Sequence, residues 1–326
     1  MALSPRLFVG TVGEGIFRSD DGGQTFTRRS AGMFVECDVR ALAAHPQDPR
    51  VIYAGTSEGL YRTRDGGERW ELVDSPMNWL VIWSLLIDPR SPETLFVGTR
   101  PAHLFRSGDS GRSWADLRAG FAPHCNNIIF NRVTTILSDP GDPDRLWAGV
   151  ETDAVWQSAD RGGTWVRREA GLSSPDIHAM VIVPDHGGGG RLLASTNNDL
   201  NSSDDGGRTW KPQRLSEQAE WPYFRGLAQK ADDPHVILLG NGDAPPGRVG
   251  AIWVSSDGGI RWGKAMLPCL PNSTIWGFAT HPGDPNRIYA HTVSGELYES
   301  TDGGPTWAKL PREFGEIRSL LWVPGS

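Results

Sequence analysis

The sequence is poor in cysteine, has no excess of positive charge and contains no long apolar run. Its three cysteines, Cys37, Cys125 and Cys269, are odd in number and widely spaced. This spacing excludes a disulfide framework and a CxxC metal knuckle, so we expect free thiols. The formal net charge of −7 leaves no basic surplus to neutralise phosphates. We therefore expect neither a nucleic-acid partner nor binding to an acidic membrane surface.

A helical period and a secretory leader are also missing. The 40 glycines and 24 prolines favour short strands and tight turns over long helices. Residues 1–6 lead directly into the strand-like segment Leu7-Phe8-Val9-Gly10, without the charged, apolar and small-residue regions of a signal peptide. We therefore expect an all-β protein in the cytoplasm.

The sequence does contain one short pattern seven times. It reads Ser or Thr, any residue, Asp, any residue, Gly, any residue, usually Thr, then an aromatic residue, as in the first copy from Ser19 to Phe26. The intervals between the repeated aspartates are 44, 44, 51, 45, 52 and 45 residues. This period over the whole chain predicts a repeat architecture, with residues 1–326 as one domain. The repeated aspartates are Asp21, Asp65, Asp109, Asp160, Asp205, Asp257 and Asp302.

Each residue type in the pattern suits a tight turn. The Asp side chain accepts hydrogen bonds from backbone N–H groups two or three residues further on, and the Gly adopts the positive φ that the turn requires. The aromatic residue buries a large apolar surface under the turn. We therefore interpret each copy as a structural staple of one hairpin.

This pattern resembles the Asp-box, or BNR, repeat, and its seven copies cover essentially the whole chain. The chain is thus similar to the Asp-box propellers, a group that includes sialidases, xyloglucanase-type glycosidases, sortilin-like receptors and the photosystem II assembly factor. The resemblance implies a β-propeller. It leaves the activity open, since the members of the group do unrelated things. The departures from the pattern are Arg69, Arg261 and Ser113 in place of Thr, and Phe26 in place of Trp.

A set of four predicted strands repeats along the chain, once for each box. In its first full copy, residues 39–43 predict an inner strand A, 51–55 a strand B, 59–62 a strand C and 70–73 a strand D. The chain begins with strands B, C and D and ends with a lone strand A at 317–322. We therefore predict a seven-bladed β-propeller with four-stranded antiparallel blades, closed by the C-terminal strand A joining the N-terminal strands B, C and D.

The two faces of this propeller differ in regularity. The A–B turns and the boxes lie on one face, and the D–A and B–C loops lie on the other. Two of the intervals exceed the basic repeat, and the extra residues fall in the D–A segment 119–131 and the B–C segment 241–248. Insertions confined to one face of a repeat array usually mark the binding face, so we expect the functional site on the D–A/B–C face.

Alignment of the seven A strands places charged and aromatic residues around the axis at the mouth of that face. The second strand position holds Arg40, Trp83, Thr134, His178, Arg225, Trp276 and Arg318. Two residues earlier stand Asp38, Val81, Arg132, Asp176, Tyr223, Thr274 and Glu316. The loops of the same face add Glu151, Asn198, Asp199, Asn241, Asp243 and Asn272.

Two interpretations of these residues remain open. The pairs Asp38–Arg40, Asp176–His178 and Glu316–Arg318 can be ion pairs between blades, with tryptophans packed among them. Alternatively, the arginines offer forked donors to a carboxylate, sulfate or phosphate, and the tryptophans offer flat walls to a sugar ring. The substrate-binding residues of this second interpretation are Asp38, Arg40, Trp83, Arg132, Asn198, Asp199, Arg225, Asn241, Asp243, Asn272, Trp276, Glu316 and Arg318.

The candidate catalytic residues are Asp176, His178, Tyr223 and Glu151. A histidine beside carboxylates can take or give a proton near neutral pH. The same oxygen and imidazole groups can bind a divalent cation, although we expect no required cofactor.

Two functions are consistent with these residues. The first is a hydrolase or lyase, glycosidase-like, that acts on a small anionic or carbohydrate-like molecule at the mouth. The alternative is a non-catalytic propeller that binds a ligand or a protein segment, resembling the photosystem II assembly factor.

Overall fold

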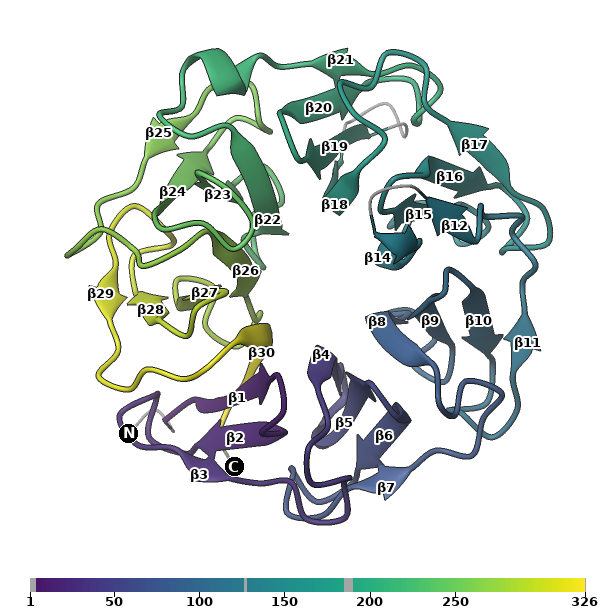
Figure 1. Ribbon diagram of the computed structural model, residues 1–326, viewed down its shortest axis with the longest axis vertical. Helices are drawn as coiled ribbons and strands as arrows, with labels where there is room; N and C mark the ends of the chain where they lie inside the picture. Colours follow the sequence, from purple (N-terminus) through teal and green to yellow (C-terminus); the bar gives the residue numbers. More distant parts are fainter. Residues whose placement is uncertain (1–3, 126–127, 185–189, 326) are drawn as a thin grey trace.

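The fold is a ring of seven four-stranded antiparallel sheets around a central axis (Figure 1). It is taken from a computed structural model that describes residues 4–125, 128–184 and 190–325. The ring confirms the predicted all-β, seven-bladed propeller. Within these ranges the helical content is one short 3-10 turn, η1 (Leu215–Glu217). No helix there is long and apolar enough to cross a membrane.

The A strands lie innermost and the B strands pack behind them (Figure 1). The A strands are β4 (Val39–His45), β8 (Val81–Ile87), β14 (Val133–Ser138), β18 (Ile177–Val183), β22 (Tyr223–Gln229), β26 (Ile275–Ala279) and β30 (Ile317–Val323). The B strands are β1 (Arg6–Thr11), β5 (Asp48–Thr56), β9 (Leu95–Arg100), β15 (Leu146–Val150), β19 (Arg191–Thr196), β23 (Ile237–Gly242) and β27 (Ile288–Thr292).

The C and D strands form the outer half of each blade. The C strands are β2 (Ile16–Ser19), β6 (Gly59–Thr63), β10 (Leu104–Ser107), β16 (Ala154–Ser158), β20 (Leu200–Ser203), β24 (Gly250–Ser255) and β28 (Leu297–Ser300). The D strands are β3 (Thr27–Arg28), β7 (Glu71–Leu72), β11 (Ala115–Asp116), β17 (Val166–Arg168), β21 (Lys211–Pro212), β25 (Gly263–Lys264) and β29 (Ala308–Lys309). The D strands are shorter than predicted, since the box aromatic precedes the strand instead of opening it.

The seventh blade joins the two ends of the chain. Its sheet has the strand order β3-β2-β1-β30, and β1 pairs with β30 from Arg6 opposite Val323 to Thr11 opposite Ile317. This pairing confirms the predicted closure. It also covers an edge of β1 that would otherwise be exposed.

The boxes act as staples, as predicted. In the box of Asp205, the Ser203 hydroxyl donates to the Asp205 carboxylate at 2.8 Å and accepts the Gly207 N–H at 2.8 Å. The Thr209 hydroxyl donates to the other carboxylate oxygen at 2.7 Å. The Ser/Thr-to-Asp hydrogen bond recurs in all seven boxes. The boxes also contact the A–B turns, because the Gly66 N–H in one box donates to Arg50 O.

Neighbouring blades fit closely, and at five of the seven junctions a β-branched residue of the A strand packs on a glycine of the preceding B strand. A Cβ added to Gly55 would lie 2.5 Å from Ile82 Cγ2, and one added to Gly149 would lie 2.6 Å from Ile177 Cγ2. Such contacts leave no room for a larger residue. The buried core is accordingly a series of clusters between blades, one of which contains Trp147, Ile177 and Trp210.

The closing strand can be tested by truncation. A chain that ends at Glu316 lacks β30 and exposes the edge of β1, so it should be insoluble or melt far below the parent protein. A chain that ends at Val323 keeps β30 and serves as the matched control. Equal melting temperatures for the two truncated chains would contradict the observed topology.

The boxes predict a loss of stability in acid. Hydrogen bonds from Thr209 hold the pKa of Asp205 at about 2, and bonds from Ser113 do the same for Asp109, against 3.8 for a free carboxyl group. A carboxylate with a lowered pKa in the folded state stabilises the fold above the unfolded pKa, and that stabilisation disappears as the folded pKa is approached. The free energy of unfolding should therefore fall as the pH drops from about 4 to about 2.

The measurement is urea denaturation at several pH values. Asp205→Asn cannot ionise, so it should be less stable at pH 7 by about 1–2 kcal/mol and lose less stability in acid. Asp204→Asn changes the exposed neighbour and should behave like the parent protein. Parent-like acid behaviour of Asp205→Asn would contradict this account of the boxes.

Candidate functional site

A β-bulge occurs at the same place in all seven A strands. In the first full blade, Val39 faces Thr56 and Ala41 faces Gly55, which leaves Arg40 unpaired. The register shifts in the same way in the other six blades, at the other members of the predicted ring. Bulges redirect a side chain out of the regular alternation of a strand. They explain how these residues come to surround the axis.

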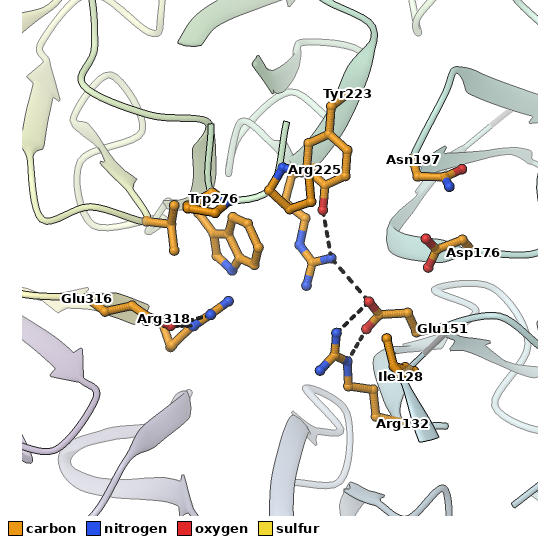
Figure 2. A pocket seen from close by; sticks show the side chains of 13 residues that line it. Ile128, Arg132, Glu151, Asp176, Asn197, Tyr223, Arg225, Trp276, Glu316 and Arg318 are labelled. Atoms are coloured by element: carbon orange, nitrogen blue, oxygen red, sulfur yellow. Dashed lines mark hydrogen bonds and ion pairs between the residues drawn. The ribbon is translucent and has the colours of Figure 1, made fainter. Parts of the chain in front are cut away.

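A cavity of about 460 Å³ opens at this mouth (Figure 2). Eight predicted site residues line it, and they come from five blades. The two insertions also reach it, through Ile128 of the D–A segment and through Pro245 and Pro246 of the B–C segment. The predicted residues in its wall are Arg132, Glu151, Asp176, Tyr223, Arg225, Trp276, Glu316 and Arg318. Glu316, just before the closing strand β30, forms an ion pair with Arg318 of that strand.

Two tryptophans hold the arginines in place. The Arg225 and Arg318 guanidinium carbons lie 4.1 and 4.6 Å from the centre of the Trp276 ring (Figure 2). Trp83 has the same arrangement, with Arg132 at 4.0 Å and Arg40 at 4.6 Å. The two arginines of each group approach the ring from the blades on either side of it. Cation–π contacts of this kind orient the guanidinium groups and are strongest when desolvated.

Glu151 connects the two groups. It lies at the end of β15, where both of its carboxylate oxygens accept hydrogen bonds from Arg132, and it lies 3.9 Å from Arg225 Nη1. Burial opposes the ionisation of Glu151, but the bonds from Arg132 and the charge of Arg225 outweigh it and hold the pKa of Glu151 at about 2. Glu151 is therefore a fixed anion at neutral pH and does not donate a proton.

Arg225 is buried and has few partners for its five donors. Its Nη1 lies 3.4 Å from the Tyr223 hydroxyl, and no shorter hydrogen bond to it exists within the described residues. Burial raises the pKa of Tyr223, so its phenol keeps its proton. A buried guanidinium beside a cavity can donate two parallel hydrogen bonds to an anion.

His178 and Asp176 form a second polar pair beside Tyr223. The His178 ring is buried, its Nδ1 lies 2.6 Å from Phe224 O, and its centre lies 5.0 Å from that of Tyr223. Because a carbonyl only accepts, Nδ1 carries the ring proton. Burial and the charge of Arg225 lower the pKa of His178, which favours the neutral ring. Its Nε2 faces Asp176 Oδ1 at 3.5 Å.

The predicted ion pairs form, but within one strand segment rather than between blades. Arg40 bonds Asp38 at 2.6 Å, and Arg318 bonds Glu316, two residues away in each case. The prediction of inter-blade pairs is wrong because the bulge brings residues i and i+2 together. Contacts between blades are made instead by the arginine–tryptophan groups and by hydrogen bonds such as that from His178 to Phe224 O.

Five predicted binding residues do not line the cavity, because their polar atoms hold loops together. Asp199 accepts the N–H groups of Arg214 and Leu215, and Asn241 bonds Trp221 O. The other three also bond residues of loops. They are Asn198 with Ser173, Asp243 with the N–H groups of Arg248 and Val249, and Asn272 with Ser294 O. Three further predicted residues lie outside the cavity wall but are linked to it. Trp83 stacks on Arg132 of the wall, Arg40 stacks on Trp83, and Asp38 bonds Arg40.

The sequence alignment missed part of the cavity wall. Val293 and the pair Pro245–Pro246 line the cavity without having been selected as binding residues. The two prolines lie inside the inserted B–C segment, so the insertion itself was a signal. The alignment gave no sign that Val293 lines the cavity, because an apolar residue after a strand is common in this chain and does not by itself indicate a binding site.

No protein-family model matches the chain. It is 22% identical to the probable oligoxyloglucan-reducing end-specific xyloglucanase of Neosartorya fischeri, over 88% of this chain and 41% of that protein. It is 24% identical to a xyloglucanase of a Paenibacillus species, over 70% of this chain and 26% of that protein. The chain thus spans less than half the length of these curated relatives.

Solved structures share the fold. The GH74 xyloglucanase from Xanthomonas campestris superposes with a TM-score of 0.67 at 18% identity, covering 93% of this chain and 52% of that one. YCF48 bound to D1 peptide superposes with a TM-score of 0.59 at 16% identity, covering 89% of this chain and 90% of that one. These likenesses confirm the resemblance to Asp-box propellers, and at such identities they establish the fold and not the activity.

Proposed function

We propose that this protein is a carbohydrate-active enzyme, a hydrolase or lyase, that acts on a small acidic sugar bound in the central cavity. Arg225 carries the proposal. The residue is 5% exposed, and its guanidinium is stacked on Trp276 and has the Tyr223 hydroxyl at 3.4 Å. Arg132 and Arg318 line the same cavity. A carboxylate or sulfate would take two parallel hydrogen bonds from Arg225 and offset the charge of the group.

The tryptophans favour an acidic sugar over a neutral one. Neutral sugars usually bind by stacking on an exposed aromatic face. Here guanidinium groups lie 4.0–4.6 Å from the ring centres of Trp83 and Trp276, where a sugar ring would otherwise stack. Recognition in the cavity would therefore depend on charge and hydrogen bonding.

The remaining cavity groups suit proton transfer. Hydrolysis of a glycosidic bond and elimination from a uronic acid both need one group that takes a proton and one that gives a proton. The Asp176–His178 pair supplies lone pairs for the first role. Tyr223 supplies a phenol proton for the second, and Arg225 would neutralise the carboxylate of a uronic acid. The xyloglucanase relatives support a sugar as the substrate class.

A second candidate is a non-catalytic propeller that holds a protein segment. The observation that favours it is a row of exposed apolar side chains on three successive D–A connections of the same face. The YCF48 structure, which matches this chain over nearly its whole length, is bound to a peptide. The exposed residues are Phe34, Val35, Trp79, Ile129 and Phe130.

A substitution of Arg225 distinguishes a role in anion binding from a structural role. Arg225→Ala should weaken the binding of an acidic sugar by about 1.5–3 kcal/mol, the value of a charged hydrogen bond, with little change in melting temperature. Binding is measured by calorimetry with galacturonate, glucuronate and sialic acid, and with xylose as the neutral comparison. Asp205→Ala, in a box on the opposite face, is the matched control and should lose stability while keeping affinity. A lower melting temperature with unchanged affinity for Arg225→Ala would contradict the proposal.

The reaction type can be read from the products. Acidic oligosaccharides are incubated with the protein, and new reducing ends and ultraviolet absorbance are followed together. A hydrolase produces reducing ends alone, whereas a lyase also produces an absorbing double bond. Asp176→Asn should lower either rate at least about a hundredfold, the usual contribution of acid–base catalysis. If no acidic oligosaccharide is cleaved and a peptide ligand binds instead, the second candidate holds.

A further inference from the structure

Three side chains converge on one side of the cavity. Glu151 at the end of β15, Asp176 just before β18 and His178 within β18 bring one potential ligand atom each to within 4.8 Å of the others. Glu151 and His178 are buried, and Asp176 is half-buried. One imidazole nitrogen and two carboxylate oxygens are a ligand set that suits divalent first-row transition metals.

The orientation of His178 directs its second nitrogen at Asp176. Nδ1 donates to Phe224 O at 2.6 Å, which leaves Nε2 as the nitrogen that can bind a metal ion. Nε2 lies 3.5 Å from Asp176 Oδ1, a buried oxygen that receives no hydrogen bond within the described part of the chain. A buried carboxylate oxygen without a hydrogen bond is costly unless a positive charge lies beside it.

The surroundings of these groups match those of a metal ligand. A ligating histidine usually donates its other N–H to a carbonyl or carboxylate, which fixes the ring, and Phe224 O takes that role here. Glu151 is in turn oriented by Arg132, and each of its oxygens keeps a further lone pair. The positive charges of Arg225 and Arg132 oppose the binding of a cation. The negative charges of Glu151 and Asp176 together balance these two charges.

We propose that Glu151, Asp176 and His178 bind one divalent transition-metal ion, such as Mn²⁺ or Zn²⁺, with its remaining coordination positions open to the cavity. The ion supplies the positive charge beside Asp176 Oδ1. It lies in the same cavity as Arg225, so an anionic substrate would meet positive charge from both. The inference rests on the proposed function and revises it at one point, because a water bound to the ion, instead of the Asp176–His178 pair, would take the proton. Ion binding itself is measured without any substrate.

The experiment titrates chelator-treated protein with Mn²⁺ and follows the loss of the free-ion signal by electron paramagnetic resonance. Calorimetry with Zn²⁺ supplies an independent measurement. The parent protein should bind one ion per chain. Asp176→Asn, which keeps the shape of the side chain, and His178→Gln should each weaken binding about tenfold or more. Glu14→Gln removes an exposed carboxylate from a B–C loop of the same face and should bind like the parent.

Circular dichroism and melting curves establish that each variant is folded, and Asp176→Asn alone suffices if His178→Gln unfolds. Absence of binding by the parent for both ions, or parent-like affinity of Asp176→Asn, would overturn the metal site. A parent protein that binds neither ion and still cleaves an acidic sugar also overturns the metal site, and it leaves the proposed enzyme standing. Ion binding without cleavage of any acidic sugar supports the site and counts against the enzyme instead.

Discussion

The close approach of neighbouring inner strands brings seven blades around one axis. At five of the seven junctions the B strand has a glycine and the following A strand a β-branched residue, as at Gly55 with Ile82 and Gly149 with Ile177. The close fit brings every A strand to the axis, where β30 completes the last sheet beside β1. All the charged residues at the mouth owe their proximity to this packing.

That proximity has an electrostatic cost. Arg40, Arg132, Arg225 and Arg318 lie close together, and burial with the charges of Arg40 and Arg225 lowers the pKa of Arg318 to about 10. Carboxylates offset part of this repulsion, and the rings of Trp83 and Trp276 separate the guanidinium groups. Besides its stack on Trp276, Arg225 has long contacts only, at 3.9 Å with Glu151 and at 3.4 Å with the Tyr223 hydroxyl, within the described residues. Long contacts repay little of the desolvation of a buried charge.

The two faces of the ring have different tasks. Asp boxes repeat on one face with the same hydrogen bonds in every blade, which is the regularity expected of a structural element. The other face carries the insertions, the bulges and the cavity. Relatives with the same fold include xyloglucanases and a protein bound to a peptide, so the fold is compatible with either function.

From the sequence alone follow the number of blades, their closure and the face on which the central cavity lies. The box recurs as a local pattern with local hydrogen bonds, and its period counts the blades without reference to distant residues. The alignment of A strands also identified the residues around the axis, from Arg40 to Arg318, because equivalent positions in a repeat occupy equivalent places.

Only the tertiary structure decided which of these residues meet. Asp199, Asn241 and Asn272 align with the mouth but bond residues of other loops, and loop conformation does not follow from the repeat. The bulge that leaves His178 unpaired depends on the register with β19. The convergence of His178 with Glu151 and Asp176 depends further on how adjacent blades are rotated about the axis. These are long-range packing geometries, which no local pattern encodes.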